Sequence, residues 1–344
     1  MKTFAILATL VIAASSSPAS TSSLEKFSPH FSTNTPILWT AATNHLPKTA
    51  WVYRRLGSRI FPATVISNAI VLASLQSKGF PQPSTNQTSV TADEDADCPC
   101  GHPCVFCINP DFATISYSIR HPERGSGNDI PSDETVVRRA WECAVQLGLD
   151  PKQLQQIPLT SHFCDSDEIG RATTNHIGGR GECLSRQLDG ICFWGSGDDN
   201  ASEGLWIEFG SHGAIRSYFL NWPNLKRHEN QPTASPQQII ACIRAQKIIV
   251  VPNGDEEKYF ERVEALATAK MFTITKITPY YNEGVYGEAP TNNLPSKFIV
   301  PVAELEAVAD FGSSNQTVRI FAPFLQSDIA RLLADQTATN VGDK

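Results

Sequence analysis

The clearest pattern of apolar and polar residues lies between residues 180 and 222, where the two kinds alternate. Leu205, Ile207 and Phe209 alternate with Trp206 and Glu208, a period of two that is typical of a strand with one buried face. Asp189-Gly190 lies between two further apolar runs and is a favourable hairpin turn. We therefore predict that this stretch forms consecutive antiparallel strands at the centre of a sheet.

Elsewhere the apolar residues recur with a helical period. Residues 132–148 have the widest apolar face, with Ser132 placed to cap the N-terminus of a helix and Gly148 to cap its C-terminus. Residues 63–77 show the same period, and a capping box predicts a further helix over 235–246. Helices are therefore expected beside the strands in both halves of the chain.

The order of these elements predicts the fold class. A capped helix followed by several antiparallel strands occurs in residues 111–230 and again, more loosely, in residues 231–335. This order is typical of α+β proteins, in which helices cover one face of a sheet. We predict an α+β fold with helices packed on antiparallel sheets in two related layers. An N-terminal helical and irregular segment, residues 21–110, would precede them, and residues 336–344 would form a polar tail.

The first twenty residues have the composition of a cleaved secretory leader. Lys2 precedes an apolar run from Phe4 to Ala14, and small residues follow it, as a signal-peptidase site requires. The run is too short to cross a bilayer. We expect residues 1–20 to be a signal peptide of a fungal type, and the mature protein to be secreted without a membrane attachment.

Glycosylation sequons agree with this destination. They begin at Asn86, Asn200 and Asn315, and each lies beside turn-forming residues, where a glycan could point outward. The net charge of −7 gives no basic stripe for a nucleic acid, and no Lys/Arg run favours an anionic membrane. We predict a glycoprotein that binds no nucleic acid.

Nine cysteines in an oxidising compartment are expected to form mostly disulfides, and the odd number leaves one thiol over. The segment 98–107 holds four of them with His102, which also suits a zinc site, but secretion favours two local disulfides. Cys183 and Cys192 could bridge two predicted strands. The disulfide candidates are Cys98, Cys100, Cys104, Cys107, Cys143, Cys164, Cys183 and Cys192. We expect neither a bound metal nor a cofactor.

Aromatic residues on the predicted strands are the first candidate ligand site. Trp206 alternates with the apolar residues of its strand, and Tyr218 alternates with Ile215, Ser217 and Phe219 on the next. Both rings would then lie opposite the most apolar face and could line a sugar or peptide groove. The alternative is that both faces of the sheet are covered and the rings belong to the core.

A polar cluster is the second candidate site. His162, Asp165, Asp167 and His176, with a further glutamate between them, could bind a metal or perform acid–base chemistry. Their spacing matches no zincin or EF-hand pattern. The alternative is a solvated acidic loop with two incidental histidines.

The element order is similar to that of PepSY-like and cystatin-like modules, in which a helix packs on a curved antiparallel sheet and the last hairpin has a glycine turn. The residues that carry the resemblance are the 132–148 helix, Asp189-Gly190, and Glu208-Phe209-Gly210 leading through Gly213 to Ile215. The resemblance implies a binding, inhibitory or regulatory domain rather than an enzyme.

We therefore predict a secreted, disulfide-stabilised glycoprotein that acts without catalysis by binding a protein, a peptide or a small ligand. The alternative is a secreted enzyme, either a hydrolase or a tailoring enzyme of a biosynthetic pathway. That enzyme would use the histidine and aspartate cluster near residues 162–176.

Overall fold

The computed structural model describes eleven segments of the chain. Within these segments, side chains are not described in 63, 104–105, 161–166, 172–178, 249–251, 283 and 335–339. The segments are residues 34–56, 63–73, 104–109, 113–119, 129–156, 161–166, 172–193, 203–251, 266, 268–283 and 298–339.

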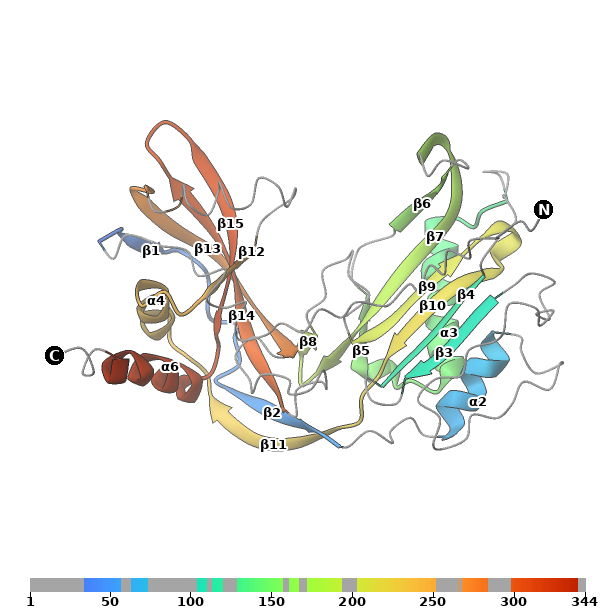
Figure 1. The fold of residues 1–344 in the computed structure, drawn as a ribbon, viewed down its shortest axis with the longest axis horizontal. Helices are drawn as coiled ribbons and strands as arrows, with labels where there is room; N and C mark the ends of the chain where they lie inside the picture. Colours follow the sequence, from blue (N-terminus) through green and yellow to red (C-terminus); the bar gives the residue numbers. More distant parts are fainter. Residues whose placement is uncertain are drawn as a thin grey trace, which may run out of the picture.

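Strands make up most of these segments (Figure 1). In chain order they are β1 (Ile37–Trp39), β2 (Thr49–Arg55), β3 (Cys104–Asn109), β4 (Thr114–Ile119), β5 (Leu154–Gln156), β6 (Ser161–Ser166), β7 (Ala172–Leu188), β8 (Ile191–Phe193), β9 (Gly204–Phe209), β10 (Ile215–Asn221), β11 (Leu225–Pro232), β12 (Ile249–Val251), β13 (Met271–Glu283), β14 (Phe298–Asp310) and β15 (Asn315–Pro323). The α-helices are α2 (Ala63–Leu72), α3 (Asp133–Leu147), α4 (Pro236–Arg244) and α6 (Gln326–Thr339).

The strands are joined into one large mixed sheet, and this arrangement corrects the predicted fold class. The main path runs β11-β2-β14-β13-β8-β7-β9-β10-β4-β3 through the 15-stranded sheet. The pairs β1–β13 and β8–β13 are parallel. An α+β fold of helices on antiparallel sheets in two related layers is therefore wrong, because the fold is dominated by a sheet with few helices. The helix-then-strands order could not reveal that the early strands β1 and β2 join the late strands β13 and β14.

The predicted helices α3 and α4 are confirmed together with their caps. The side chain of Ser132 accepts a hydrogen bond from the backbone of Thr135, and Gly148 ends α3 in the left-handed conformation with φ 85°. Ser235 and Gln238 form the reciprocal capping box at the start of α4. Local signals were sufficient here because a cap satisfies backbone groups within its own turn.

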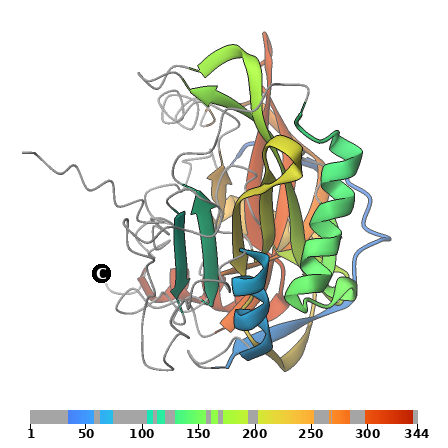
Figure 2. The ribbon, with the colours of Figure 1, turned by 90° about the vertical axis from the view of Figure 1, so that its right-hand side faces the viewer.

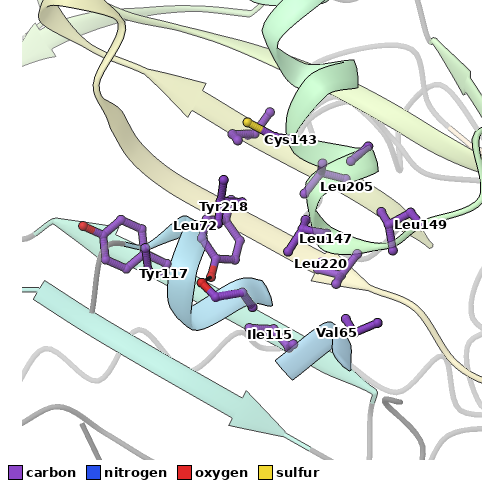
Figure 3. Close-up of a cluster of buried hydrophobic side chains, with 14 of the residues drawn as sticks. Val65, Leu72, Ile115, Tyr117, Cys143, Leu147, Leu149, Leu205, Tyr218 and Leu220 are labelled. Carbon is purple, nitrogen blue, oxygen red and sulfur yellow. Dashed lines mark hydrogen bonds between the residues drawn. The ribbon is translucent and has the colours of Figure 1, made fainter. Parts of the chain in front are cut away.

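We call the part of the sheet formed by β3–β7, β9 and β10 the N-terminal half. It has one core, formed where α2 and α3 cover a face of the sheet (Figures 2 and 3). Tyr218 lies in this core beside Leu72, and its hydroxyl donates to the carbonyl of Ala69 at 2.8 Å. The Tyr218 ring stacks on Tyr117 with 5.6 Å between centroids. Other buried members include Val65, Ile115, Leu147, Leu184, Leu205, Ile207, Phe209 and Leu220. Both helices thus lie on the same side of β4, β9 and β10.

We call the part formed by β1, β2 and β11–β15 the C-terminal half. It has a second core between α4, α6 and the sheet of β13, β14 and β15. Ile239 and Ile243 of α4 pack here with Ile329 of α6. The sheet contributes small and branched residues such as Ala303 and Leu305. Among the described helices, none is long and apolar enough to span a membrane.

A third apolar cluster joins the two halves. β8 leaves the N-terminal sheet and pairs in parallel with β13, placing Phe193 opposite Tyr281. The rings of Phe193 and Tyr53 each lie 5.3 Å from the ring of Tyr281. Aromatic pairs at this separation add to the free energy gained by burial, so the halves are held by a packed interface and not by a linker alone.

Candidate functional site

Three charged side chains meet inside the interface between the halves, and we call them the arginine junction: Arg55 of β2, Arg186 of β7 and Glu203 just before β9. Arg186 Nη1 lies 3.3 Å from Glu203 Oε2, and Arg55 Nη2 lies 3.5 Å from Glu203 Oε1. The side chain of Glu203 is 2% exposed and that of Arg186 6%. Buried charges of this kind persist only when they are paired and hydrogen-bonded.

Arg186 is held from several directions. Its Nη1 donates to the carbonyl of Pro223 at 2.6 Å, and its Nη2 donates to Gln153 Oε1 at 3.2 Å. The guanidinium carbon also lies 4.2 Å from the centre of the Trp222 ring, a cation–π contact. These contacts fix the side chain and use most of its donors, so the junction is built to hold the chain together.

Burial and ion pairing act in opposite directions on the charged groups of the arginine junction. Two guanidiniums face one carboxylate, and burial disfavours the charged form of each group. Burial raises the pKa of Glu203 to about 7, although both guanidiniums oppose that shift. Burial also lowers the pKa of Arg55 and Arg186. Desolvation therefore opposes the charged form of all three groups, and the ion pairs between them offset part of that cost.

A second polar contact joins the halves beside the junction. The hydroxyl of Tyr53 and the guanidinium of Arg227 both donate to the carboxylate of Asp189, at the turn between β7 and β8. Burial, followed by the hydrogen bond to Asp189, raises the pKa of Tyr53 to about 12. Tyr53 is therefore a neutral hydroxyl that fixes the β7–β8 hairpin to β2.

The other face of the N-terminal sheet holds a row of five paired residues, the aromatic row. Cys183 of β7 lies opposite Trp206 of β9, which lies opposite Phe219 of β10. Phe219 is opposite Ser116 of β4, and Ser116 is opposite Cys107 of β3. All five are half-buried, whereas the helix-covered face is almost fully buried. Within the described segments, no helix packs on this face (Figure 2).

The prediction that Trp206 and Tyr218 share a face is wrong. Tyr218 is opposite Ile207 and only 1% exposed, so it belongs to the core while Trp206 points the other way. A β-bulge between Ile215 and Ser217 inserts one extra residue and reverses the alternation that follows. Phe219, one position later, is the true aromatic neighbour of Trp206. A strict period of two could not reveal this, because a bulge leaves no compositional signal here.

A polar group borders the aromatic row. Glu208 lies on the same face as Trp206; its Oε1 is 3.1 Å from Arg216 Nη1, and its Oε2 accepts from Ser217 Oγ at 2.9 Å. A Cβ on Gly179 would lie 2.5 Å from Glu208 Oε1. A side chain at this position would therefore displace the Glu208–Arg216 ion pair from the geometry seen here. Charged and hydroxyl groups thus adjoin the aromatic rings.

The structure spreads out the predicted histidine cluster. β6 and β7 form a hairpin that contains His162, Asp165 and His176, while Asp167 lies outside the described residues. His162 is opposite Arg180, and His176 lies four residues from Arg180 along β7. At about 3.3 Å per residue the two histidines are roughly 13 Å apart along the strand. In the parts of the chain with described side chains, no group of three or more His, Cys, Asp or Glu could hold a metal.

The predicted bridge between Cys183 and Cys192 is wrong. Cys192 is opposite Gln187, four residues along β7 from Cys183, so roughly 13 Å of strand separates the two positions. The Cys192 thiol instead donates to Gln155 Oε1 at 2.8 Å. Cys143 is a buried thiol in the N-terminal core, where burial raises its pKa to about 11.

The remaining disulfide candidates are only partly described. No disulfide joins Cys107, Cys143, Cys183 or Cys192 to another described cysteine. Cys98 and Cys100 lie outside the described residues, as do the side chains of Cys104 and Cys164. Disulfides among these four stay a prediction.

One of the three sequons can be placed in the structure. Asn315 is exposed at the start of β15, next to the turn from β14. Asn86 and Asn200 lie outside the described residues. Glycosylation at all three positions stays a prediction.

A buried carboxylate in β7 gives a prediction on pH. Glu182 is fully buried, and its Oε2 has no hydrogen-bond partner in the described chain. Burial, with a smaller contribution from Asp133, raises its pKa to about 7, above the value in the unfolded chain. The folded state therefore binds the proton of the Glu182 carboxyl more tightly than the unfolded chain does. The stability that this group gives the wild type is lost as the pH rises from about 4.5 to about 7.

We expect Glu182→Gln to remove this loss. Urea denaturation at pH 5 should give similar free energies of unfolding for variant and wild type, and at pH 8 the variant should be more stable by about 2 kcal/mol. Glu229→Gln, at an exposed position of β11, is the matched control and should give no such difference. A stability difference for Glu182→Gln that does not grow between pH 5 and pH 8 would contradict the assignment.

No protein-family model matches the chain, and no curated protein matches it.

Proposed function

We propose that the protein is a secreted, non-enzymatic binding protein, that the aromatic row is its ligand surface, and that the ligand is a carbohydrate. The observation that carries the proposal is the cross-strand pair of Trp206 and Phe219. It lies half-buried on a face that no described helix covers, whereas the rings of the opposite face are buried in the core. Secretion follows from the predicted leader sequence.

The position of the row favours a sugar over a peptide. Peptides that bind sheets commonly add a strand at an open edge and use its free backbone groups. β9 and β10 are interior strands, flanked by β7 and β4, so their backbone groups are already paired. A sugar needs only an aromatic face to stack on and polar groups for its hydroxyls. Trp206 and Phe219 supply the first, and the cluster of Glu208, Arg216 and Ser217 supplies the second.

The test is affinity electrophoresis of the full mature protein in gels that contain laminarin, hydroxyethylcellulose, xylan or mannan. At least one polysaccharide should retard the wild type. Trp206→Ala should weaken that retardation about tenfold, because an aromatic contact is worth about 1 kcal/mol and the ring also loses buried area.

Trp141→Ala is the matched control, since Trp141 lies on α3 and packs against the core on the other side of the same sheet. It should retain binding. The proposal is overturned if no polysaccharide retards the wild type. It is equally overturned if Trp206→Ala migrates like the wild type while circular dichroism shows that both are folded.

A further inference from the structure

A small cavity lies in the C-terminal half, away from the aromatic row. Its volume is about 150 Å³. Its walls come from β1, the loop that follows β1, β13, the turn between β11 and α4, and the first turn of α4. The lining residues are Trp39, Thr43, Leu46, Pro47, Lys48, Thr233, Ala234, Pro236, Ile239 and Ile277. Most of these are apolar, and a cavity of about this volume accommodates a benzene ring.

Two polar side chains in the walls, Trp39 and Thr233, already donate hydrogen bonds to backbone carbonyls. Trp39 Nε1 donates to the carbonyl of Ala41 at 3.0 Å, so the indole presents an apolar ring to the cavity. Thr233 Oγ1 donates to the carbonyl of Pro47 at 2.7 Å, and the Thr233 amide donates to the carbonyl of Lys48 at 3.1 Å. These bonds fix the wall in place before any ligand arrives, which lowers the entropy cost of binding.

The helix beside the cavity offers no free cap. Ser235 and Gln238 satisfy the N-terminus of α4 between themselves, and Pro236 has no amide hydrogen. Lys48 is exposed among the lining residues and forms no ion pair with any described carboxylate. The cavity thus combines an apolar interior with one flexible cation on its lining.

We propose that this cavity binds a small aromatic carboxylate. The ring would fill the apolar interior between Trp39, Ile239 and Ile277, and the carboxylate would remain at the mouth, near the ammonium of Lys48. An uncharged aromatic ligand would gain only the free energy of burying its ring. A cationic aromatic ligand would be repelled by the like charge of Lys48. The site is independent of the aromatic row, so either can fail without the other.

The probe is 4-fluorobenzoate, observed by fluorine NMR with the full mature protein. The wild type should bind it more tightly than fluorobenzene, and fluorobenzene more tightly than 4-fluorobenzylamine. Lys48→Met keeps the aliphatic stem and removes the charge. It should weaken 4-fluorobenzoate binding about fivefold, the value of an exposed ion pair of about 1 kcal/mol, and leave fluorobenzene unchanged.

Lys226→Met is the matched control for the change in net charge. Lys226 is exposed on β11, seven residues before Thr233, and so lies about 20 Å from the cavity along the strand. The Lys226→Met variant should bind all three probes as tightly as the wild type does. Ala234→Leu, which fills the cavity, should abolish binding of 4-fluorobenzoate and fluorobenzene alike.

Three results would overturn the proposal. They are no binding of 4-fluorobenzoate to the wild type at millimolar concentrations, equal binding of the benzoate and the benzylamine, and unchanged benzoate binding by Lys48→Met. The two lysine variants change exposed side chains and are expected to fold. The test therefore holds even if Ala234→Leu fails to fold.

Discussion

Replacing Arg186 with Met is expected to lower the free energy of unfolding by about 3 kcal/mol or more at pH 8. The change removes the closer counter-ion of a fully buried carboxylate and leaves Glu203 with Arg55 alone, at 3.5 Å. It also leaves the buried carbonyl of Pro223 without its donor and the Trp222 ring without its cation. A buried charge that loses its partner costs far more than the pair contributed in net stability.

The loss should be smaller at pH 5. The pKa of Glu203 is raised to about 7 by burial, so at pH 5 the carboxyl is neutral and no longer needs a counter-ion. Urea denaturation of the wild type and Arg186→Met at both pH values measures the difference. A penalty that is the same at both would show that Arg186 acts through packing and hydrogen bonds and not through its charge.

A triple variant separates charge from packing further. Combining Arg55→Met, Arg186→Met and Glu203→Leu removes all three charges of the arginine junction at once. We expect it to regain a large part of the stability lost by Arg186→Met, because apolar side chains of similar volume often replace a buried ionic group at little cost. A triple variant less stable than the single one would contradict this account.

The second large effect is expected at Gly204. Its φ is +143°, and a Cβ there would lie 2.2 Å from the carbonyl oxygen of Leu184, a backbone atom that cannot turn away. Gly204→Ala should therefore push β9 away from β7, with an expected loss of about 4 kcal/mol from backbone strain and overpacking combined. The shift would also displace the neighbouring Glu203 from Arg186.

Gly190 provides the matched control. Its φ is also positive, at +78°, but a Cβ there would meet nothing within 4 Å. Gly190→Ala should cost about 1 kcal/mol, the conformational penalty alone. Urea denaturation of both variants tests the difference, and equal losses would mean that the contact with Leu184 is relieved without cost.

The sequence was informative wherever the determining contacts are local. Ser132, Gly148 and Ser235 set the ends of α3 and α4 through bonds within one turn. The hairpin between β7 and β8 has the predicted turn, with Asp189 and Gly190 both at positive φ, as a two-residue turn of this kind requires. These features need no knowledge of the rest of the fold.

The sequence was uninformative wherever the contacts are distant or irregular. Nothing near Arg55 indicates a partner at Glu203, 148 positions later, and a lone charge in a strand is ordinarily solvated. The bulge at Arg216 reverses the faces of β10 and so misplaces Tyr218 in any count of alternation. The aromatic row is likewise visible only after five strands are aligned.

The pairing of β2 with β14 has a consequence for how the protein is made. Ile299 lies opposite Tyr53, a contact between segments 246 positions apart. A nascent chain would therefore emerge from the ribosome with β2 lacking this partner until almost the whole polypeptide had been synthesised, and contacts this far apart form slowly. During that interval the exposed strand would need a chaperone or its own neighbour β11 to keep it from aggregating.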